Sequence, residues 1–160
     1  MVIQVTRIEI AKLLGVCSAA FPHVTVTKYT SEVYGELLAD LDFDLAMKAI
    51  RTILSTHEFF PSVAVIRKTT AELAGALAPS GTSAWAEVIE RVKSSGRSDF
   101  GPFSHPTIDA TVKMIGWRDI CLADNVASVR AHFMKTYEGL KVIHDRPALV
   151  GSSQRALEAL

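Results

Sequence analysis

The chain has 160 residues, which leaves room for one domain or for two small helical lobes that share a core. Apolar residues make up 49% of it and the mean hydropathy is +0.24, so the chain can bury a core and is not disordered throughout. Seventeen basic and seventeen acidic residues give a formal net charge of zero. This balance argues against a strongly basic protein that coats nucleic acid and against an acidic tail protein.

Cysteine usage and the N-terminal residues indicate the compartment. The two cysteines, Cys17 and Cys121, are too few for a disulfide scaffold and lie in apolar surroundings, so we expect reduced, buried thiols. The first seven residues lack the basic region and the apolar stretch of a signal peptide. No apolar run approaches the ~20 residues that a membrane span needs. We therefore expect a cytoplasmic protein without a membrane partner.

Four helices are predicted in the first half of the chain. A capping box at Thr6 to Glu9 starts the first helix, which Pro22 ends. The second helix begins near Thr27, and Asp42 is a good N-cap for the third. Their connection is short, so we expect these two helices to pack as an antiparallel hairpin. Ser62 caps the fourth helix. The buried positions expected on the four helices are Ile10, Leu13, Leu14, Cys17 and Phe21; Val33, Tyr34, Leu37 and Leu38; Leu45, Ala46, Ala49, Ile50, Ile53 and Leu54; and Val63, Ile66, Leu73 and Leu77.

Three more helices are predicted after the turn-forming stretch at 78–82, which is the clearest boundary signal in the chain. Thr82 or Ser83 is expected to cap the first of them. The second is expected to start at Pro106 and to end at Gly116. The third is expected to be capped by Asp124 or Asn125 and to end at Pro147. The predicted fold is therefore all-α. An N-terminal four-helix bundle covers residues 1–78, a three-helix lobe covers residues 79–146, and residues 147–160 form a short flexible tail.

No catalytic or cofactor motif emerges. The glycine-containing stretch Gly75–Thr82 lacks the lysine that a phosphate-binding loop needs. The acidic run Asp40–Asp44 mimics the start of a calcium loop, but Leu45 stands where that loop needs Gly, and Arg51 where it needs Glu. The five histidines show none of the spacings of zinc motifs. We therefore expect no metal, no cofactor and no enzymatic activity.

Two histidine-containing alternatives remain open. A small helical enzyme using Cys121 or His132 would show a thiol with a depressed pKa and fast alkylation in the native state. The dipeptide His144-Asp145 is similar to one found in metal phosphohydrolases. We prefer to interpret it as a cationic histidine near the C-terminal dipole of a helix.

A small DNA-binding, replisome-organising module is the alternative function. Lys48 and Arg51 are three residues apart on one helix, and Arg91, Lys93 and Arg97 cluster at the end of another. Such a module would lose affinity steeply with salt, because its basic groups neutralise phosphates. The simpler interpretation of these residues is a set of solvated helix faces.

The order of motifs in the first half resembles a known family, the small helical proteins that load or inhibit phage replicative helicases. The motifs, in order, are Ser-Ala-Ala-Phe-Pro at 18–22, Val-Thr at 26–27, Val33–Leu38 with Asp40, Leu45–Ala49 and Phe59–Arg67. The chain departs from the family pattern at Ala64-Val65, where an acid is frequent, and at Tyr34, where Trp is frequent. The second half is similar to the extension of longer phage proteins of this type.

The resemblance implies a non-enzymatic adaptor in the host cytoplasm. Its partner would be a hexameric DnaB-type replicative helicase, which it loads or inhibits until an origin-binding initiator receives it; direct DNA contact stays open. We expect the tail to lay an amphipathic segment in a groove of the helicase. The partner-binding residues predicted in this tail are Leu149, Val150, Arg155, Leu157 and Leu160. Truncation after Arg146 is expected to leave the fold intact and to abolish helicase binding.

Overall fold

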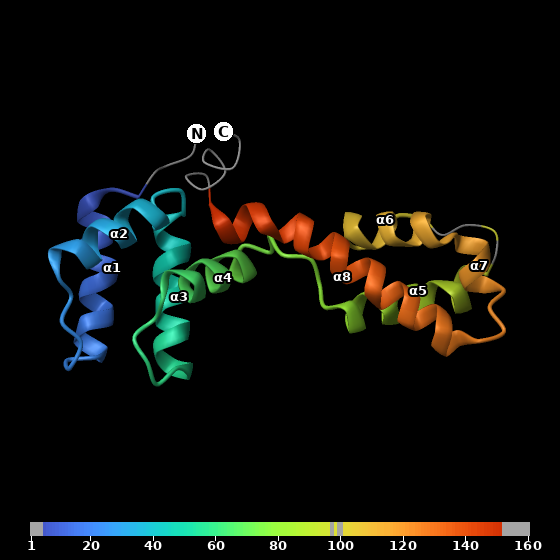
Figure 1. Cartoon of the computed structure of the whole chain (residues 1–160), viewed down its shortest axis with the longest axis horizontal. Coiled ribbons are helices and arrows are strands. Elements are labelled where there is room, and N and C mark those ends of the chain that lie inside the picture. The colour runs from blue at the N-terminus through green and yellow to red at the C-terminus, as the bar shows by residue number, and fades with distance from the viewer. Residues whose placement is uncertain (1–4, 97, 99–100, 152–160) are drawn as a thin grey trace. The chain divides into compact units, whose positions relative to one another are not determined.

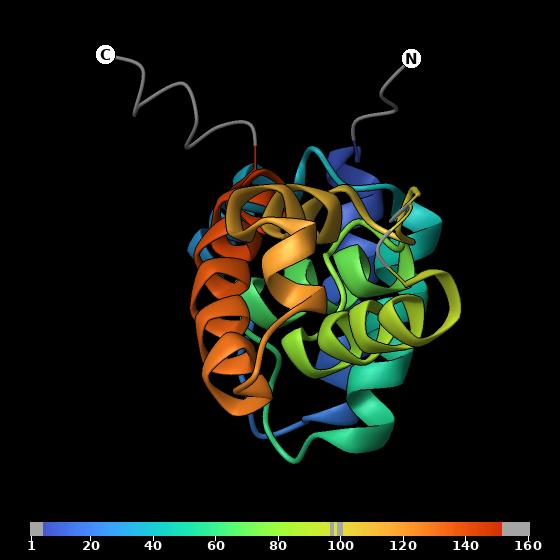
Figure 2. The same ribbon diagram turned by 90° about the vertical axis from the view of Figure 1, so that its right-hand side faces the viewer.

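The computed structural model describes residues 5–96, 98 and 101–151. In this part of the chain there are eight helices and no strand (Figures 1 and 2). The prediction of an all-α fold is confirmed. None of the helices in the described ranges is long and apolar enough to cross a membrane.

The chain divides into two compact units. Unit 1 comprises residues 1–76 together with residues 146–160, and unit 2 comprises residues 77–145. The boundaries predicted from the sequence, after residues 78 and 146, lie near these points, but the last segment is predicted there as a separate tail. Residues 146–151 are grouped with the N-terminal helices, and residues 152–160 of the predicted tail lie outside the described residues.

Unit 1 contains four helices of the first half, each started by a side-chain cap. They are α1 (Arg7–Ala20), α2 (Lys28–Leu38), α3 (Phe43–Thr56) and α4 (Val63–Leu73). The Thr6 hydroxyl accepts from the Glu9 N–H while the Glu9 carboxylate accepts from the Thr6 N–H, which confirms the capping box. The predicted caps Asp42 and Ser62 are confirmed as well, and Thr27, near which the second helix is predicted to begin, is the N-cap of α2.

The helices of unit 1 pack differently from the predicted hairpin. The main contacts pair α3 with α4, α1 with both α2 and α3, and α2 with α4. The expectation of an α2–α3 hairpin is wrong, because α3 turns its buried stripe toward α1 and α4. Accordingly only Leu38 of α2 is buried, Val33 is 49% exposed, and half-buried Tyr34 donates its hydroxyl hydrogen to the Pro61 carbonyl oxygen at 2.9 Å. The buried residues of the core are Val5, Ile10, Leu13, Leu14, Cys17, Leu38, Ala46, Ile50, Ile53 and Ile66.

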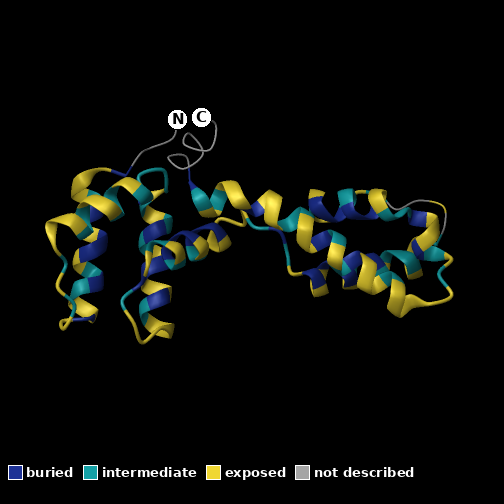
Figure 3. Ribbon diagram, viewed as in Figure 1, coloured by how far each residue is buried: buried dark blue, intermediate teal, exposed yellow. Residues whose placement is uncertain are grey.

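Unit 2 has one helix more than predicted. Its helices are α5 (Gly81–Ser95), α6 (Pro106–Ile115), α7 (Trp117–Cys121) and most of α8 (Val126–Val150). The short α7 follows directly on Gly116, whose positive φ of 99° turns the chain out of α6 and into a new helix. The described residues of this lobe therefore form four helices. Its buried residues are Ala84, Trp85, Val88, Phe103, Ile108, Val112, Trp117, Ile120, Phe133 and Tyr137; in both units the buried positions form stripes along the helices (Figure 3).

Of three helix starts predicted in the second half, one is wrong and two are confirmed. Ser80 caps α5, its hydroxyl accepting from the Ser83 N–H at 3.1 Å, so the predicted caps Thr82 and Ser83 are wrong and lie inside the first turn of the helix. Pro106 stands in the first turn of α6 as predicted. The Asn125 carboxamide accepts from the Ser128 N–H at 3.0 Å at the start of α8.

Candidate partner-binding site

The predicted partner-binding residues fall at and beyond the end of α8. Leu149 is 37% exposed and Val150 is half-buried, and both lie in the last turn of that helix. Arg155, Leu157 and Leu160 lie outside the described residues. The prediction that the helix ends at Pro147 is wrong, because α8 continues through it to Val150.

A buried arginine contacts the last turn of this helix. Arg67 of α4 has a side chain only 4% exposed, and its guanidinium forms a two-pronged contact with the Asp40 carboxylate, Nη1 to Oδ1 at 2.7 Å and Nη2 to Oδ2 at 3.0 Å. Nη1 also donates to the Leu37 carbonyl oxygen at 2.7 Å. Paired, two-pronged geometry is what lets an arginine be buried without leaving a charge uncompensated.

The same guanidinium satisfies the end of α8. Nε donates to the Leu149 carbonyl oxygen at 3.0 Å, and Nη2 donates to that of Ala148 at 3.3 Å. The last four carbonyls of a helix have no partner within the helix, so Arg67 supplies donors to two of them. The cationic side chain also lies at the negative end of the helix dipole. We call Arg67, Asp40 and the carbonyls of Leu37, Ala148 and Leu149 the Arg67 anchor.

Gly151 completes the anchor. Its N–H donates to the Pro147 carbonyl oxygen at 3.4 Å, and its φ is +85°, the left-handed conformation that glycine adopts after a helix. A Cβ at this position would lie 2.7 Å from Nη2 of Arg67. Only glycine fits the site, and the chain therefore leaves α8 directly over the buried guanidinium.

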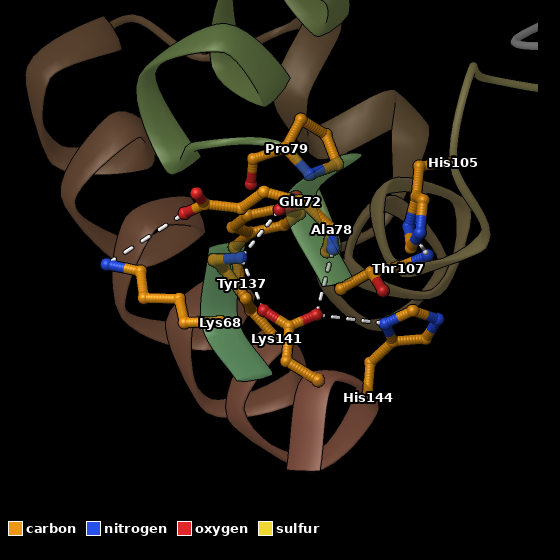
Figure 4. Close-up of polar contacts among 10 residues, drawn as sticks. Lys68, Glu72, Ala78, Pro79, His105, Thr107, Tyr137, Lys141 and His144 are labelled. Carbon is orange, nitrogen blue, oxygen red and sulfur yellow. Dashed lines mark hydrogen bonds and ion pairs between the residues drawn. The ribbon is translucent and has the colours of Figure 1, made fainter. Parts of the chain in front are cut away.

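A second polar cluster ties together the two ends of unit 2 (Figure 4). The carboxylate of buried Asp145 accepts from the Ala78 N–H at 2.8 Å, from Nζ of Lys141 at 2.5 Å and from Nδ1 of His144 at 3.1 Å. Lys141 also donates to the Ala78 carbonyl oxygen, and the Tyr137 hydroxyl donates to that of Pro79 at 2.8 Å. The cluster fastens the chain just before α5 to α8.

The charges of this cluster indicate a structural role. Burial by itself would raise the pKa of Asp145, but its hydrogen bonds with Lys141, Ala78 and His144 outweigh burial and lower the pKa below its usual range. Burial raises the pKa of Tyr137 to about 12. The rings of His105 and His144 pack edge to face, with their centroids 4.5 Å apart. Burial is the main cause that lowers the pKa of His105, and the charge of the neighbouring His144 lowers it further.

The His144-Asp145 dipeptide belongs to this cluster. His144 does not lie in the last turn of α8, so the preferred interpretation as a partner of the C-terminal dipole is wrong. Within the described ranges no group of three or more His, Cys, Asp or Glu residues is placed to hold a metal ion. The dipeptide therefore has a hydrogen-bonding role in which Asp145 is the acceptor.

The cysteines differ in accessibility. Cys17 is fully buried in the core of unit 1, and burial raises the pKa of its thiol to about 11, which makes it a poor nucleophile. Cys121 is half-buried, and its thiol lies 3.5 Å from the Gly96 carbonyl oxygen. His132 is exposed on α8.

The basic residues of the DNA-binding alternative fall in separate units. Lys48 and Arg51 are exposed on α3 of unit 1. Arg91 of α5 is half-buried: its guanidinium lies 5.3 Å from the centroid of the Phe103 ring and donates to the Pro102 carbonyl oxygen at 3.4 Å. Lys93 is exposed on the last turn of α5.

Sequence reasoning misses the role of Arg67. The residue closes the Phe59–Arg67 motif, but the motif alone assigns it no function. One signal is present: Arg67 follows Val63 by four residues and precedes Thr70 by three, so it lies on the inward face of its helix. A charged residue on that face needs a buried partner.

Comparison with known proteins finds a similarity for the first part of unit 1. The family model that describes the N-terminal domain of the phage gene 39 protein matches residues 6–67, from the N-cap of α1 to Arg67. No curated protein and no solved structure matches the chain. Over residues 6–67 the chain is similar to the N-terminal domain of the gene 39 protein, the family of phage helicase loaders and inhibitors that its motifs resemble.

Proposed function

We propose that the protein is a phage DNA-replication accessory protein that binds a DnaB-type replicative helicase in the host cytoplasm and loads or inhibits it. The observation that carries the proposal is the match of residues 6–67 to the N-terminal domain of the gene 39 protein. In this proposal the protein is an adaptor and not an enzyme. The origin-binding initiator would then be the second partner, which receives the helicase from the adaptor.

The Arg67 anchor supports a separation between the folded helices of unit 1 and a partner-binding segment that follows them. It fixes the chain at Gly151, so that residues 152–160 start from a defined point on the family domain. Leu157 and Leu160 provide apolar side chains and Arg155 a positive charge, which suits helix-in-groove docking on a large partner. Ordering a short segment on binding costs conformational entropy, which keeps the complex releasable. A loader must release its helicase.

The experiment is to mix the full chain with its cognate helicase and to measure the mass of the complex by light scattering, with and without ATP. A complex of defined stoichiometry is the expected result. Helicase unwinding measured in the presence of the chain then separates the two activities, since an inhibitor lowers the rate while a loader raises it when the initiator is present. Absence of a complex in both nucleotide states would remove the proposal.

DNA binding is the competing function, and the exposed pair on α3 gives it a direct test. Under this alternative, replacing Lys48 and Arg51 with Gln would weaken binding to duplex DNA and reduce the salt dependence by about one unit of slope for each phosphate that is no longer neutralised. Lys93→Gln alone serves as a single-site comparison on unit 2. Under the adaptor proposal, duplex DNA binding is weak in all three proteins and the substitutions leave helicase binding unchanged.

A further inference from the structure

The start of α6 is held by a histidine side chain. His105 is the N-cap of this helix, and its Nδ1 accepts a hydrogen bond from the Thr107 N–H at 3.2 Å (Figure 4). Pro106 between them has no N–H, and the N–H groups of Ile108 and Asp109 both donate to the His105 carbonyl oxygen, at 2.9 and 3.4 Å. Nδ1 is therefore the acceptor that the structure gives to the first N–H of the helix. Thr107 is buried, so water replaces this acceptor only when the turn opens.

This hydrogen bond requires a neutral imidazole. A neutral imidazole has one nitrogen that carries a hydrogen and one that accepts, whereas a protonated imidazole only donates. Because Nδ1 of His105 accepts, the hydrogen of the neutral ring lies on Nε2. A proton added to Nδ1 therefore ends the hydrogen bond from the Thr107 N–H. It also places a positive charge at the positive end of the α6 dipole.

The charged groups that act on the His105 ring lie on α8. The ring packs edge to face against His144, whose Nδ1 lies 3.1 Å from the carboxylate of Asp145. Asp145 favours a protonated His105, whereas Lys141 and a protonated His144 repel it. The segment 77–80, which Asp145 holds through a hydrogen bond, has no titratable side chain. Burial is the largest of these influences, and together they lower the pKa of His105.

Two carboxylates fix the loop that precedes the cap. Glu87 of α5 accepts from the N–H and the hydroxyl of Ser104, at 2.7 and 2.5 Å, and Asp109 of α6 accepts from the Phe103 N–H at 3.2 Å. Phe103 is buried, and its ring packs edge to face on Trp117 with the centroids 6.4 Å apart. The loop thus connects the capped turn of α6 to the core of unit 2.

We propose that His105 is a pH-sensitive cap: protonation of its Nδ1 releases the first turn of α6 and loosens the loop that carries Phe103. The proton comes from solvent, and no covalent bond changes. The pKa of His105 is lower in the closed turn than the ordinary histidine value of 6.5, so on acidification the open state takes up this proton first. The closed turn therefore has its full stability above about pH 6.5 and loses stability as the pH falls below that value.

The size of the effect is limited by the uptake of one proton. One proton changes the equilibrium constant for opening by at most about tenfold for each pH unit, and only between pH 6.5 and the lowered pKa. From about pH 7.5 to about pH 5.5 the equilibrium constant for opening of the first turn is thus expected to rise by up to about tenfold. Protonation of Asp145 matters only below its ordinary pKa of 3.8, so the two titrations are separate.

The test compares the full chain with its His105→Asn variant by hydrogen exchange. Asn is a favoured N-cap residue whose side-chain oxygen accepts from the same N–H, but it does not titrate. Both proteins are measured at each pH, so the intrinsic pH dependence of exchange cancels in the ratio of their rates. For peptides that cover residues 101–115, the rate of the full chain relative to the variant is expected to rise by up to about tenfold from about pH 7.5 to about pH 5.5. A ratio that stays constant over this range would overturn the proposal.

His105→Ala is the second variant, because alanine offers no acceptor at any pH. Its exchange in the same peptides is expected to be fast relative to His105→Asn at both pH values, with a ratio that does not change on acidification. Exchange as slow as that of the full chain at about pH 7.5 would contradict the role of Nδ1 as the cap.

NMR of the imidazole nitrogens tests the chemistry of the cap directly. In the ¹⁵N-labelled full chain, the His105 signals are identified by their loss in His105→Asn. At about pH 7.5 Nδ1 is expected to lack a hydrogen and Nε2 to carry one, and the titration midpoint is expected below 6.5. A hydrogen on Nδ1 at this pH, or a midpoint at or above 6.5, would refute the proposal.

Discussion

The Arg67 anchor makes two closely spaced truncations differ in stability. A chain ending at Arg146 lacks Ala148 and Leu149, whose carbonyl oxygens accept from Arg67 at 3.3 and 3.0 Å, and it also lacks the glycine that covers the guanidinium. A chain ending at Gly151 keeps all of these interactions. The sequence alone suggests that truncation after Arg146 leaves the fold intact; the anchor predicts the opposite for unit 1.

The size of the effect follows from the missing hydrogen bonds. Each hydrogen bond from a charged donor contributes about 1.5–3 kcal/mol, and water replaces part of this stabilisation because the guanidinium becomes accessible. We therefore expect the shorter chain to have a free energy of unfolding of unit 1 that is lower by about 2–3 kcal/mol. The chain that ends at Gly151 should differ from the full chain in this free energy by less than about 0.5 kcal/mol, as after a surface change. The difference corresponds to a shift of about 1–2 M in the urea midpoint.

The assay is urea unfolding followed with two probes. Both tryptophans, Trp85 and Trp117, lie in unit 2, so their fluorescence reports on that unit alone. Hydrogen exchange of peptides from α1 to α4 reports on unit 1. Faster exchange in unit 1 of the shorter chain, with tryptophan fluorescence less affected, is the expected pattern. Equal exchange in the two truncated chains would refute the role assigned to the anchor.

Three further predictions concern other parts of the fold. Thr6→Ala removes the capping box with Glu9 and should lower the stability of unit 1 by about 1 kcal/mol, measured by urea unfolding. The pKa of Asp145 is lower in the folded state than its ordinary value of 3.8, so on acidification the unfolded state takes up this proton first. The stability that ionised Asp145 gives to unit 2 is therefore present above about pH 3.8 and is lost as the pH falls further. Asp145→Asn should remove this pH dependence from the unfolding of unit 2, followed by tryptophan fluorescence. With its pKa raised to about 11, Cys17 should resist alkylation at about pH 8 in the folded protein and react after unfolding, while half-buried Cys121 reacts faster; equal rates in the folded state would contradict the burial of Cys17.

Local signals in the sequence predict the helices of unit 1 well. Thr6, Asp42 and Ser62 are expected as caps, and a helix is expected to begin near Thr27; all four residues are caps in the structure. A cap satisfies backbone N–H groups within its own first turn, so a short window of sequence contains the whole interaction. The same holds for Pro106 at the start of α6.

The features that determine the candidate site are long-range, and local sequence patterns do not reveal them. The partners of Arg67 lie 27 to 82 residues away, so no local window contains them. Pro147 normally ends a helix because it lacks an N–H and crowds the preceding turn. Here α8 extends past Pro147 to Val150, and Arg67 donates to the carbonyl oxygens of Ala148 and Leu149, a contact that exists only in the tertiary structure.

Packing direction is the other source of error. The apolar stripe predicted for α2 treats Val33 as buried, but the helix packs on its neighbours chiefly through Leu38 and the Tyr34 hydroxyl. Periodicity locates a helix face, yet it does not say how much of that face the neighbouring helices cover.

The central claim is that the segment beyond the Arg67 anchor binds the helicase. It is tested most directly by measuring, by isothermal titration, the affinity of the cognate helicase for the full chain and for the chain that ends at Gly151, which keeps the anchor intact. We predict at least a tenfold loss of affinity on removal of residues 152–160, with unit 1 still folded. An unchanged affinity would contradict the claim and move the helicase-binding surface to the helices.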